Sequence, residues 1–255
     1  MRILPPILHP PKEPTRRRHK PRPATGKTGY QAFRDCLRWD FGFVCPFCLL
    51  HESDLVGGGG AERSGLTTVE HRVLQSADVS QRNDYNNCIY ACRYCNRARS
   101  TTPIEQNGQK LLDPTVAAWA NHFAAADDRL LPMADNVDAS YTYETYDLDD
   151  PIKCERRRLR RELITNRISL LRDGPQELSA LLGVAEELGR AEPEAAQHLL
   201  RVARRLREQL VCAPQDLSRF NAIPPDAPTE CRCRTKEHHV LPPEFDRQML
   251  NLAST

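Results

Sequence analysis

Long hydrophobic runs and aromatic residues are scarce in this 255-residue sequence. Aromatic residues make up 6% of the chain and apolar residues 40%. No apolar run approaches the roughly 20 residues that a helix needs to cross a bilayer, so the composition excludes an obvious membrane protein. The first apolar residues give way to Pro5 and Pro6 before they reach the length of a signal peptide. We therefore expect a cytoplasmic protein that does not contact a membrane.

A large excess of one charge is also missing, but the charges are strongly segregated. The net charge is +2. Residues 1–34 hold nine Lys or Arg and one acidic residue, whereas residues 127–150 hold eight acidic residues and one Arg. Residues 153–172 hold eight basic and two acidic residues. Such blocks indicate separate surfaces, some of them suited to a polyanion. We expect contacts with nucleic acid from Arg16, Arg17, Arg18, Arg156 and Arg157.

The pattern of proline, charge and hydrophobic spacing predicts five segments. They are a basic, proline-rich N-terminal arm (1–27), a cysteine-containing domain (28–125), an acidic linker (126–150), an α-helical region (151–213) and a proline-rich C-terminal segment (214–255). The arm is either a solvated tail or a strap on nucleic acid or a protein partner. Predicted helices cover 30–41, 93–99, 151–172, 176–188 and 194–211, and predicted strands cover 66–72, 87–91 and 139–146.

Ten cysteines are many for a chain without a secretion signal, and four of them form two close pairs. Each pair, Cys45 with Cys48 and Cys92 with Cys95, has a gap of two residues. A tight turn over such a gap directs both sulfurs at one ion, and Zn²⁺ accepts four thiolates tetrahedrally. The sequence therefore predicts a structural zinc site. The isolated residues are interpreted as small buried hydrophobes: Cys36, Cys88, Cys154 and Cys212.

Four further potential ligands lie close together near the C-terminus: Cys231, Cys233, His238 and His239. They are candidates for a second zinc site. The alternative is a loop that packs against the helical region or a partner, because a one-residue gap between cysteines and adjacent histidines are unusual for a zinc site.

The segment between the two cysteine pairs carries polar residues in a recognisable order. Glu70 and His71 end the first predicted strand, Asn87 precedes Cys92 by five residues, and Asn96 directly follows Cys95. In this order the sequence resembles the HNH endonuclease family, in its zinc-framed subtype, over residues of about 30–123. The resemblance implies an α+β fold with a ββα-metal core, followed here by a mainly α-helical region.

The resemblance also implies roles for these residues. His71 would be the general base, which a neutral imidazole can be near neutral pH. Glu70 and Asn96 would hold Mg²⁺ or Mn²⁺ through oxygen. Asn87 would fix the loop that orients His71, although the nearby Asn83 and Asn86 compete for that assignment. We further expect phosphate contacts from three arginines beside the motif: Arg93, Arg97 and Arg99.

These observations favour a metal-dependent endonuclease that hydrolyses phosphodiester bonds in nucleic acid. They do not separate DNA from RNA, although we expect DNA as the substrate. The basic arm and helical extension are similar to the HNH subunits of Septu-like anti-phage systems, which implies an ATPase partner. Restriction, mobile-element and phage-packaging nucleases share the motif. The alternatives are a zinc-stabilised nucleic-acid-binding module without cleavage and a subunit that serves mainly as an adaptor.

Overall fold

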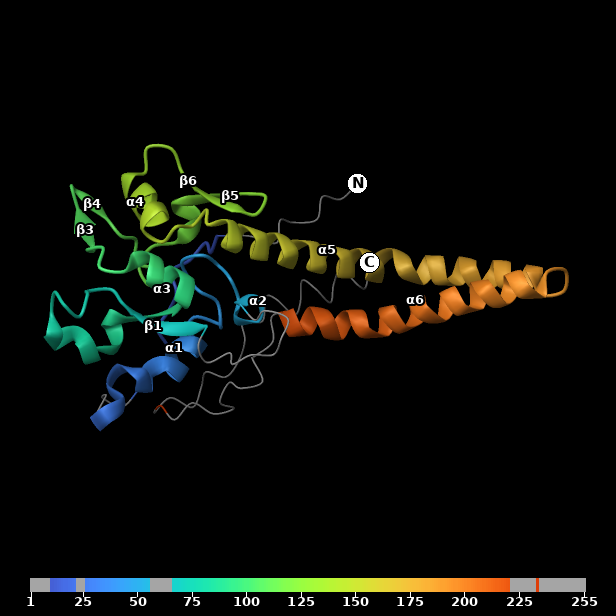
Figure 1. Cartoon of the computed structure of the whole chain (residues 1–255), viewed down its shortest axis with the longest axis horizontal. Helices are drawn as coiled ribbons and strands as arrows, with labels where there is room; N and C mark the ends of the chain where they lie inside the picture. Colours follow the sequence, from blue (N-terminus) through green and yellow to red (C-terminus); the bar gives the residue numbers. More distant parts are fainter. Residues whose placement is uncertain (1–9, 22–25, 56–65, 221–232, 234–255) are drawn as a thin grey trace. The chain divides into compact units, whose positions relative to one another are not determined.

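The computed structural model describes residues 10–21, 26–55, 66–220 and 233 (Figure 1). The described chain divides into two compact units. The first holds the described residues up to Arg161 together with Cys233, and the second begins at Glu162. The elements, in chain order, are η1 (Gly26–Phe33), α1 (Arg34–Asp40), α2 (Glu52–Leu55), β1 (Thr67–His71), η3 (Val79–Asn83), η4 (Tyr85–Asn87), β2 (Cys88–Cys92), α3 (Arg93–Arg99), β3 (Glu105–Gln106), β4 (Gln109–Lys110), η5 (Trp119–Asn121), β5 (Phe123–Ala126), β6 (Arg129–Pro132), α4 (Val137–Thr145), α5 (Pro151–Leu188) and α6 (Pro193–Phe220).

The centre of the first unit is an antiparallel strand pair followed at once by a helix. Strands β1 and β2 pair with Thr67 opposite Cys92 and His71 opposite Cys88. Helix α3 starts at the next residue, because the Cys92 sulfur accepts a hydrogen bond from the Cys95 amide at the helix N-terminus. The predicted strands 66–72 and 87–91 and the predicted helix 93–99 are therefore confirmed to within a residue, and the fold mixes helices with small strand pairs.

Aromatic side chains from distant segments form the core beside this ββα arrangement. The rings of Phe47 and Tyr146 stack with centroids 3.9 Å apart, and Trp119 packs against both Phe47 and Phe123. Leu37 of α1 is fully buried in the same cluster. The core thus joins the first cysteine pair to the end of the acidic segment.

Residues 126–150 were predicted to be a linker with a strand at 139–146, and the structure corrects both predictions. The segment forms most of the β5–β6 hairpin and all of helix α4, whose Ala139 and Tyr141 are buried in the core. Asn136 starts α4 by accepting a hydrogen bond from the Ala139 amide. Alternating tyrosines suggested a strand, but tertiary burial and the N-cap select a helix.

The described part of the N-terminal arm lies on the first unit. Pro11 accepts a hydrogen bond from the Ala120 amide at 2.9 Å, and the Thr15 amide donates to Pro114 at 2.8 Å. The amides of Arg18 and His19 both donate to Asp40 of α1. Residues 10–21 therefore lie along the surface of the first unit and are held there by hydrogen bonds of their backbone groups.

The helical region consists of two long helices. Asp150 caps α5 by accepting from the Lys153 amide, as the Asp-Pro start predicted. The predicted break near Gly174 is wrong, since α5 continues through Gly174 and Pro175 to Leu188. Likewise α6 continues through Pro214 to Phe220. No helix in the described ranges combines the length and apolarity needed to cross a membrane.

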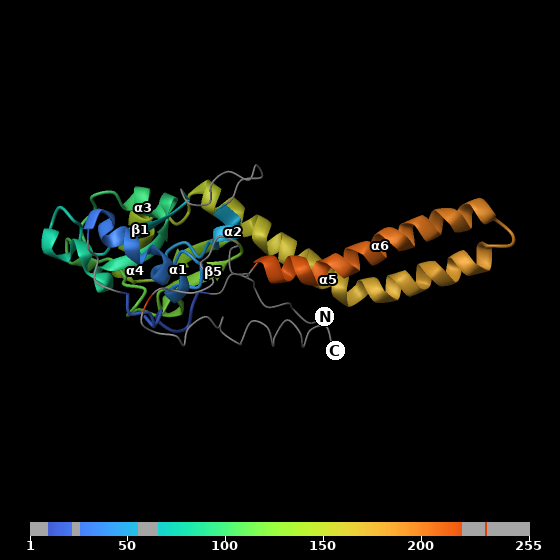
Figure 2. The same ribbon diagram turned by 90° about the horizontal axis from the view of Figure 1, so that it is seen from below.

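Within the second unit, contacts between α5 and α6 explain the uninterrupted helix. Arg167 pairs with Asp216 at 3.0 Å. A Cβ atom added at Gly174 would lie 2.8 Å from Leu210, so glycine permits the close approach of the two helices. Figures 1 and 2 both show α5 and α6 side by side and antiparallel in this unit. Packing along their length offsets the hydrogen bond that Pro175 cannot donate.

A buried ion pair joins α1, α2 and β2. The Arg38 guanidinium donates twice to the Glu52 carboxylate, both at 2.8 Å, and the Tyr90 hydroxyl also donates to Glu52. We predict that Glu52→Ala lowers the free energy of unfolding by about 3–5 kcal/mol, because it leaves the Arg38 charge buried without this carboxylate. Urea unfolding followed by circular dichroism measures the change.

The matched control is Asp35→Ala on the same helix. Asp35 lies 3.9 Å from Arg38 and its side chain is 55% exposed, so its loss should cost less than about 1 kcal/mol. Equal destabilisation by the two variants would contradict the assignment.

Candidate active site

Four cysteine sulfurs converge where the first loop of the domain meets the β2–α3 junction. Cys45 and Cys48 lie in a tight turn in which the Leu49 amide donates to the Cys45 carbonyl oxygen. Cys92 ends β2 and Cys95 lies in the first turn of α3. All four ligand atoms lie within 4.8 Å of one another and all four residues are buried.

The dimensions and electrostatics of this four-cysteine cluster are compatible with zinc. Tetrahedral Zn–S bonds of about 2.3 Å separate neighbouring sulfurs by about 3.8 Å, and the sulfurs of Cys48 and Cys92 are 3.7 Å apart. Burial raises the pKa of Cys45, but hydrogen bonds from the other three thiols lower it well below its ordinary value. Burial holds the pKa of Cys48 and Cys95 far above theirs. A divalent cation supplies the charge needed to keep all four as thiolates.

The imidazole ring of His71, the last residue of β1, is held in one orientation by hydrogen bonds at both of its nitrogens. Its Nε2 lies 2.9 Å from the carbonyl oxygen of Arg82. A carbonyl oxygen only accepts, so Nε2 carries the proton and Nδ1 carries the lone pair. The amide nitrogen of Gln75 donates to Nδ1 at 3.1 Å. Burial lowers the pKa of His71 below its ordinary value, so the ring is neutral near pH 7.

Asn87 ties together the loop that supplies the Arg82 carbonyl. Its side-chain oxygen accepts from the Val73 amide at 2.7 Å. Its side-chain nitrogen donates to the carbonyl oxygens of Val73 at 3.0 Å and Gln81 at 3.2 Å. Asn87 is buried, whereas the competing residues Asn83 and Asn86 are exposed. Of these three asparagines, only Asn87 joins the end of β1 to the residue beside Arg82.

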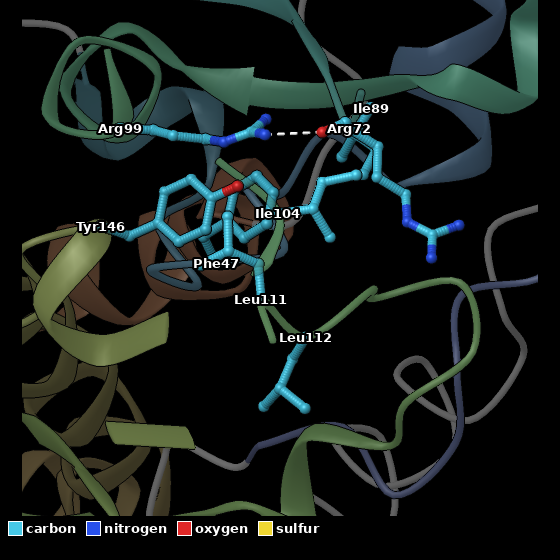
Figure 3. A pocket seen from close by; sticks show the side chains of 8 residues that line it. All are labelled: Phe47, Arg72, Ile89, Arg99, Ile104, Leu111, Leu112 and Tyr146. Carbon is cyan, nitrogen blue, oxygen red and sulfur yellow. Dashed lines mark hydrogen bonds between the residues drawn. The ribbon is translucent and has the colours of Figure 1, made fainter. Parts of the chain in front are cut away.

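Glu70 is buried and forms an ion pair with Arg99 of α3. The Arg99 guanidinium also donates to the carbonyl oxygen of His71. It donates as well to the carbonyl oxygen of Arg72, the bond that Figure 3 shows. Burial raises the pKa of Glu70 to about 7, against the favourable charge of Arg99. A small pocket beside the pair is lined by Arg72, Arg99 and apolar side chains, namely Phe47, Ile89, Ile104, Leu111, Leu112 and Tyr146.

Glu70 and Asn96 offer oxygen donors of the type that a hard divalent cation prefers. Arg99 donates to one carboxylate oxygen of Glu70 and leaves the other for a further partner. Asn96 is partly exposed and lies three residues before Arg99 on α3, so the two side chains share one side of the helix. A carboxylate and an amide oxygen form a donor set suited to Mg²⁺ or Mn²⁺.

The structure separates the predicted nucleic-acid-binding arginines into exposed and buried ones. Arg93 and Arg97 on α3 are exposed, as are Arg16 and Arg18. Arg17 is partly buried: it donates to the Cys88 carbonyl oxygen at 2.6 Å and lies over the ring of Tyr85.

Two other predicted phosphate contacts, Arg99 and Arg157, need correction, and a third, Arg156, is partly buried. Arg99 is 1% exposed and uses its guanidinium on the end of β1. Arg157 is 3% exposed and donates to backbone carbonyl oxygens, including that of Cys48 at 3.2 Å. Arg156 donates to the carbonyl oxygen of Asp54 and lies over the ring of Tyr94. Within the first unit, Arg99 and Arg157 stabilise the domain instead of facing solvent, whereas Arg156 is partly exposed.

Comparison with known proteins agrees with this geometry. Residues 45–102 match the model of the HNH endonuclease family. No curated protein and no solved structure matches the chain significantly. The matched segment runs from the first cysteine of the cluster past Arg99 and includes β1, β2 and α3. It indicates a nuclease domain whose substrate is nucleic acid.

Sequence reasoning missed the residues that complete the site. Gln75 and Arg82 contact the two nitrogens of His71, and Tyr30 packs edge-on against its ring with centroids 4.5 Å apart. Arg99 holds Glu70. Only Arg99 had a signal in the sequence, as one of several arginines beside the motif; the other contacts depend on how the loop closes.

We predict that Cys45→Ala lowers the bound zinc by one equivalent per chain and unfolds the region around β2 and α3. Loss of a thiolate removes binding free energy that is also folding free energy. Elemental analysis and near-ultraviolet circular dichroism measure the two effects. Cys212, interpreted from the sequence as buried, is exposed on α6. Cys212→Ala is therefore the control and should change neither. A fully folded Cys45→Ala protein with unchanged zinc would exclude this ligand set.

Proposed function

We propose that the protein is a metal-dependent HNH endonuclease that hydrolyses phosphodiester bonds in nucleic acid, with DNA as the preferred substrate. The observation that carries the proposal is the orientation of His71, whose Nδ1 lone pair is directed away from the carbonyl that holds Nε2. A neutral, oriented imidazole next to a buried carboxylate is what general-base hydrolysis requires. A module that only binds nucleic acid has no need for this arrangement.

In the proposed reaction, Nδ1 of His71 takes a proton from the attacking water. In the structure, the side-chain amide of Gln75 donates a hydrogen bond to Nδ1. This amide therefore occupies the position that the attacking water would take. Asn87 and the Arg82 carbonyl keep the ring from rotating while the proton is transferred. Glu70 and Asn96 would hold Mg²⁺ or Mn²⁺, which supplies charge to stabilise the scissile phosphate and the leaving oxygen.

The substrate surface in this proposal lies on α3. Arg93 and Arg97 are exposed and four residues apart, so they share one face of the helix that carries Asn96. Guanidinium groups there can contact phosphates on either side of the scissile bond. Arg16 and Arg18 of the arm offer further positive charge to the same polyanion.

The cellular role we propose is that of an effector in anti-phage defence that acts with an ATPase. Support comes from the second unit, where apolar side chains are exposed on both long helices: Leu163, Leu182, Val184, Leu200, Val202 and Val211. Apolar residues on an extended helical pair are suited to a protein partner. The remaining alternative is an adaptor that binds nucleic acid without cutting it.

We predict that His71→Ala lowers the rate of phosphodiester cleavage by about 10² to 10⁴ while zinc content and affinity for nucleic acid change little. Removal of a general base costs rate, and His71 is neither a ligand in the four-cysteine cluster nor an exposed cation. Cleavage of plasmid DNA and of single-stranded RNA is measured with Mg²⁺ or Mn²⁺. The chain is assayed alone and with the product of a neighbouring ATPase gene.

The control for this variant is His198→Ala, at an exposed position of α6 in the second unit, which should cleave like the wild type. EDTA should stop the wild-type reaction, and Mg²⁺ or Mn²⁺ should restore it without loss of zinc. Wild-type rates in His71→Ala would exclude the proposed base, and nucleic-acid binding without any cleavage would favour the adaptor.

We further predict that Arg93→Ala combined with Arg97→Ala weakens DNA binding and its dependence on salt. Each phosphate contact contributes about 0.9 to the slope of log affinity against log salt, so two lost contacts lower that slope by about 2. Fluorescence anisotropy at several salt concentrations gives the value. Arg201→Ala with Arg205→Ala, an exposed pair of the same spacing on α6, is the control. An unchanged slope in the α3 variant would show that Arg93 and Arg97 do not contact the substrate phosphates.

A further inference from the structure

A second group of potential metal ligands lies in the first unit, formed by His19, Cys36 and Cys233. In the part of the chain that the structure describes, it is one of two places where three or more such side chains converge. One ligand atom from each residue lies within 4.8 Å of the other two. The Nδ1 atom of His19 is 3.1 Å from the Cys233 sulfur. His19 and Cys36 are each 4% exposed.

The three residues come from segments that are far apart in the sequence. Cys36 lies on α1, one turn before Asp40 on the same face of the helix. The Asp40 carboxylate accepts hydrogen bonds from the backbone amides of Arg18 and His19 at 2.9 and 3.0 Å, and another from the Tyr85 hydroxyl at 2.7 Å. This anchor fixes the arm against α1 and thereby brings the His19 ring to Cys36.

The chemistry of this group is that of a soft-metal site. One imidazole nitrogen and two thiols favour Zn²⁺ over Mg²⁺, Ca²⁺ or Mn²⁺, which prefer oxygen ligands. A buried polar group costs free energy unless it has a partner, and a zinc ion accepts imidazole nitrogen and thiolate sulfur together. No acidic side chain belongs to this described group, so it lacks the carboxylate oxygens that hard cations prefer.

We propose that His19, Cys36 and Cys233 bind a second zinc ion, separate from the four-cysteine cluster and from the nuclease chemistry. The sequence had suggested a C-terminal site made of Cys231, Cys233, His238 and His239. The structure places Cys233 instead beside residues from the N-terminal arm and α1, and the other three lie outside the described residues. Bound zinc cross-links the C-terminal segment to the arm, across more than two hundred residues of sequence.

The test is the zinc content of the full-length protein and of two variants. Wild-type protein, purified under reducing conditions, should hold two zinc ions per chain by elemental analysis and native mass spectrometry. His19→Ala combined with Cys233→Ser should hold one and keep the near-ultraviolet circular dichroism of the first unit. Cys212→Ser replaces an exposed cysteine of α6 and should hold two. One zinc ion in the wild type, or two in the double variant, would overturn the proposal.

Alkylation of the wild-type protein gives a second measurement that does not depend on how a variant folds. In the zinc-loaded chain, Cys233 should react with iodoacetamide at least tenfold more slowly than Cys212, and a chelator should remove the difference. Equal rates before chelation would overturn the proposal. Detection of a disulfide between Cys36 and Cys233 in protein kept under reducing conditions would also do so, because it would explain the same proximity without a metal.

Discussion

The hydrogen bond between Nε2 of His71 and the carbonyl oxygen of Arg82 determines what the rest of the site can do. It selects one tautomer of a neutral ring and leaves Nδ1 as the only basic nitrogen. The Arg82 carbonyl is in place because Asn87 binds the same loop on both sides, at Val73 and at Gln81. The buried side-chain amide of Asn87 thus fixes the loop conformation, and this conformation in turn selects the tautomer of His71.

Two further constraints hold the strands on which this loop is built. The four-cysteine cluster joins the Cys45 turn to the end of β2 and the start of α3. Arg99, on the same helix, reaches back to Glu70 and to the carbonyl oxygens at the end of β1. The four-cysteine cluster and the buried guanidinium therefore fix α3 against β1 from two sides. Asn96 lies between them on that helix, where its position relative to Glu70 is set by both.

Local patterns in the sequence predicted much of this arrangement, and tertiary contacts decided the rest. The spacing of the cysteine pairs and the run of β1, β2 and α3 follow from short-range rules, so both could be predicted. The choice between Asn86 and Asn87 could not be predicted. Two neighbouring residues of one type differ only in whether the side chain faces the interior of the loop or the solvent. Arg97 and Arg99 likewise differ only in the direction in which their side chains leave α3. The sequence therefore predicted phosphate contacts for both.

Long-range packing overrode local signals in the helical region as well. Gly174 followed by Pro175 is a strong stop signal, yet α5 continues because α6 packs closely over the glycine. The approach of His19, Cys36 and Cys233 has no counterpart in sequence spacing. Contacts between segments so far apart carry no periodic signal, and only the folded chain reveals them.

The most direct measurement of the central claim is the tautomeric state of His71 by nitrogen-15 NMR. In zinc-loaded wild-type protein at pH 7, the account predicts a neutral ring with the proton on Nε2 and none on Nδ1. Asn87→Ala should lose this single state, because the loop that supplies the Arg82 carbonyl is no longer held. A protonated Nδ1 in the wild type, or an Nε2–H tautomer that is unchanged in Asn87→Ala, would contradict the account.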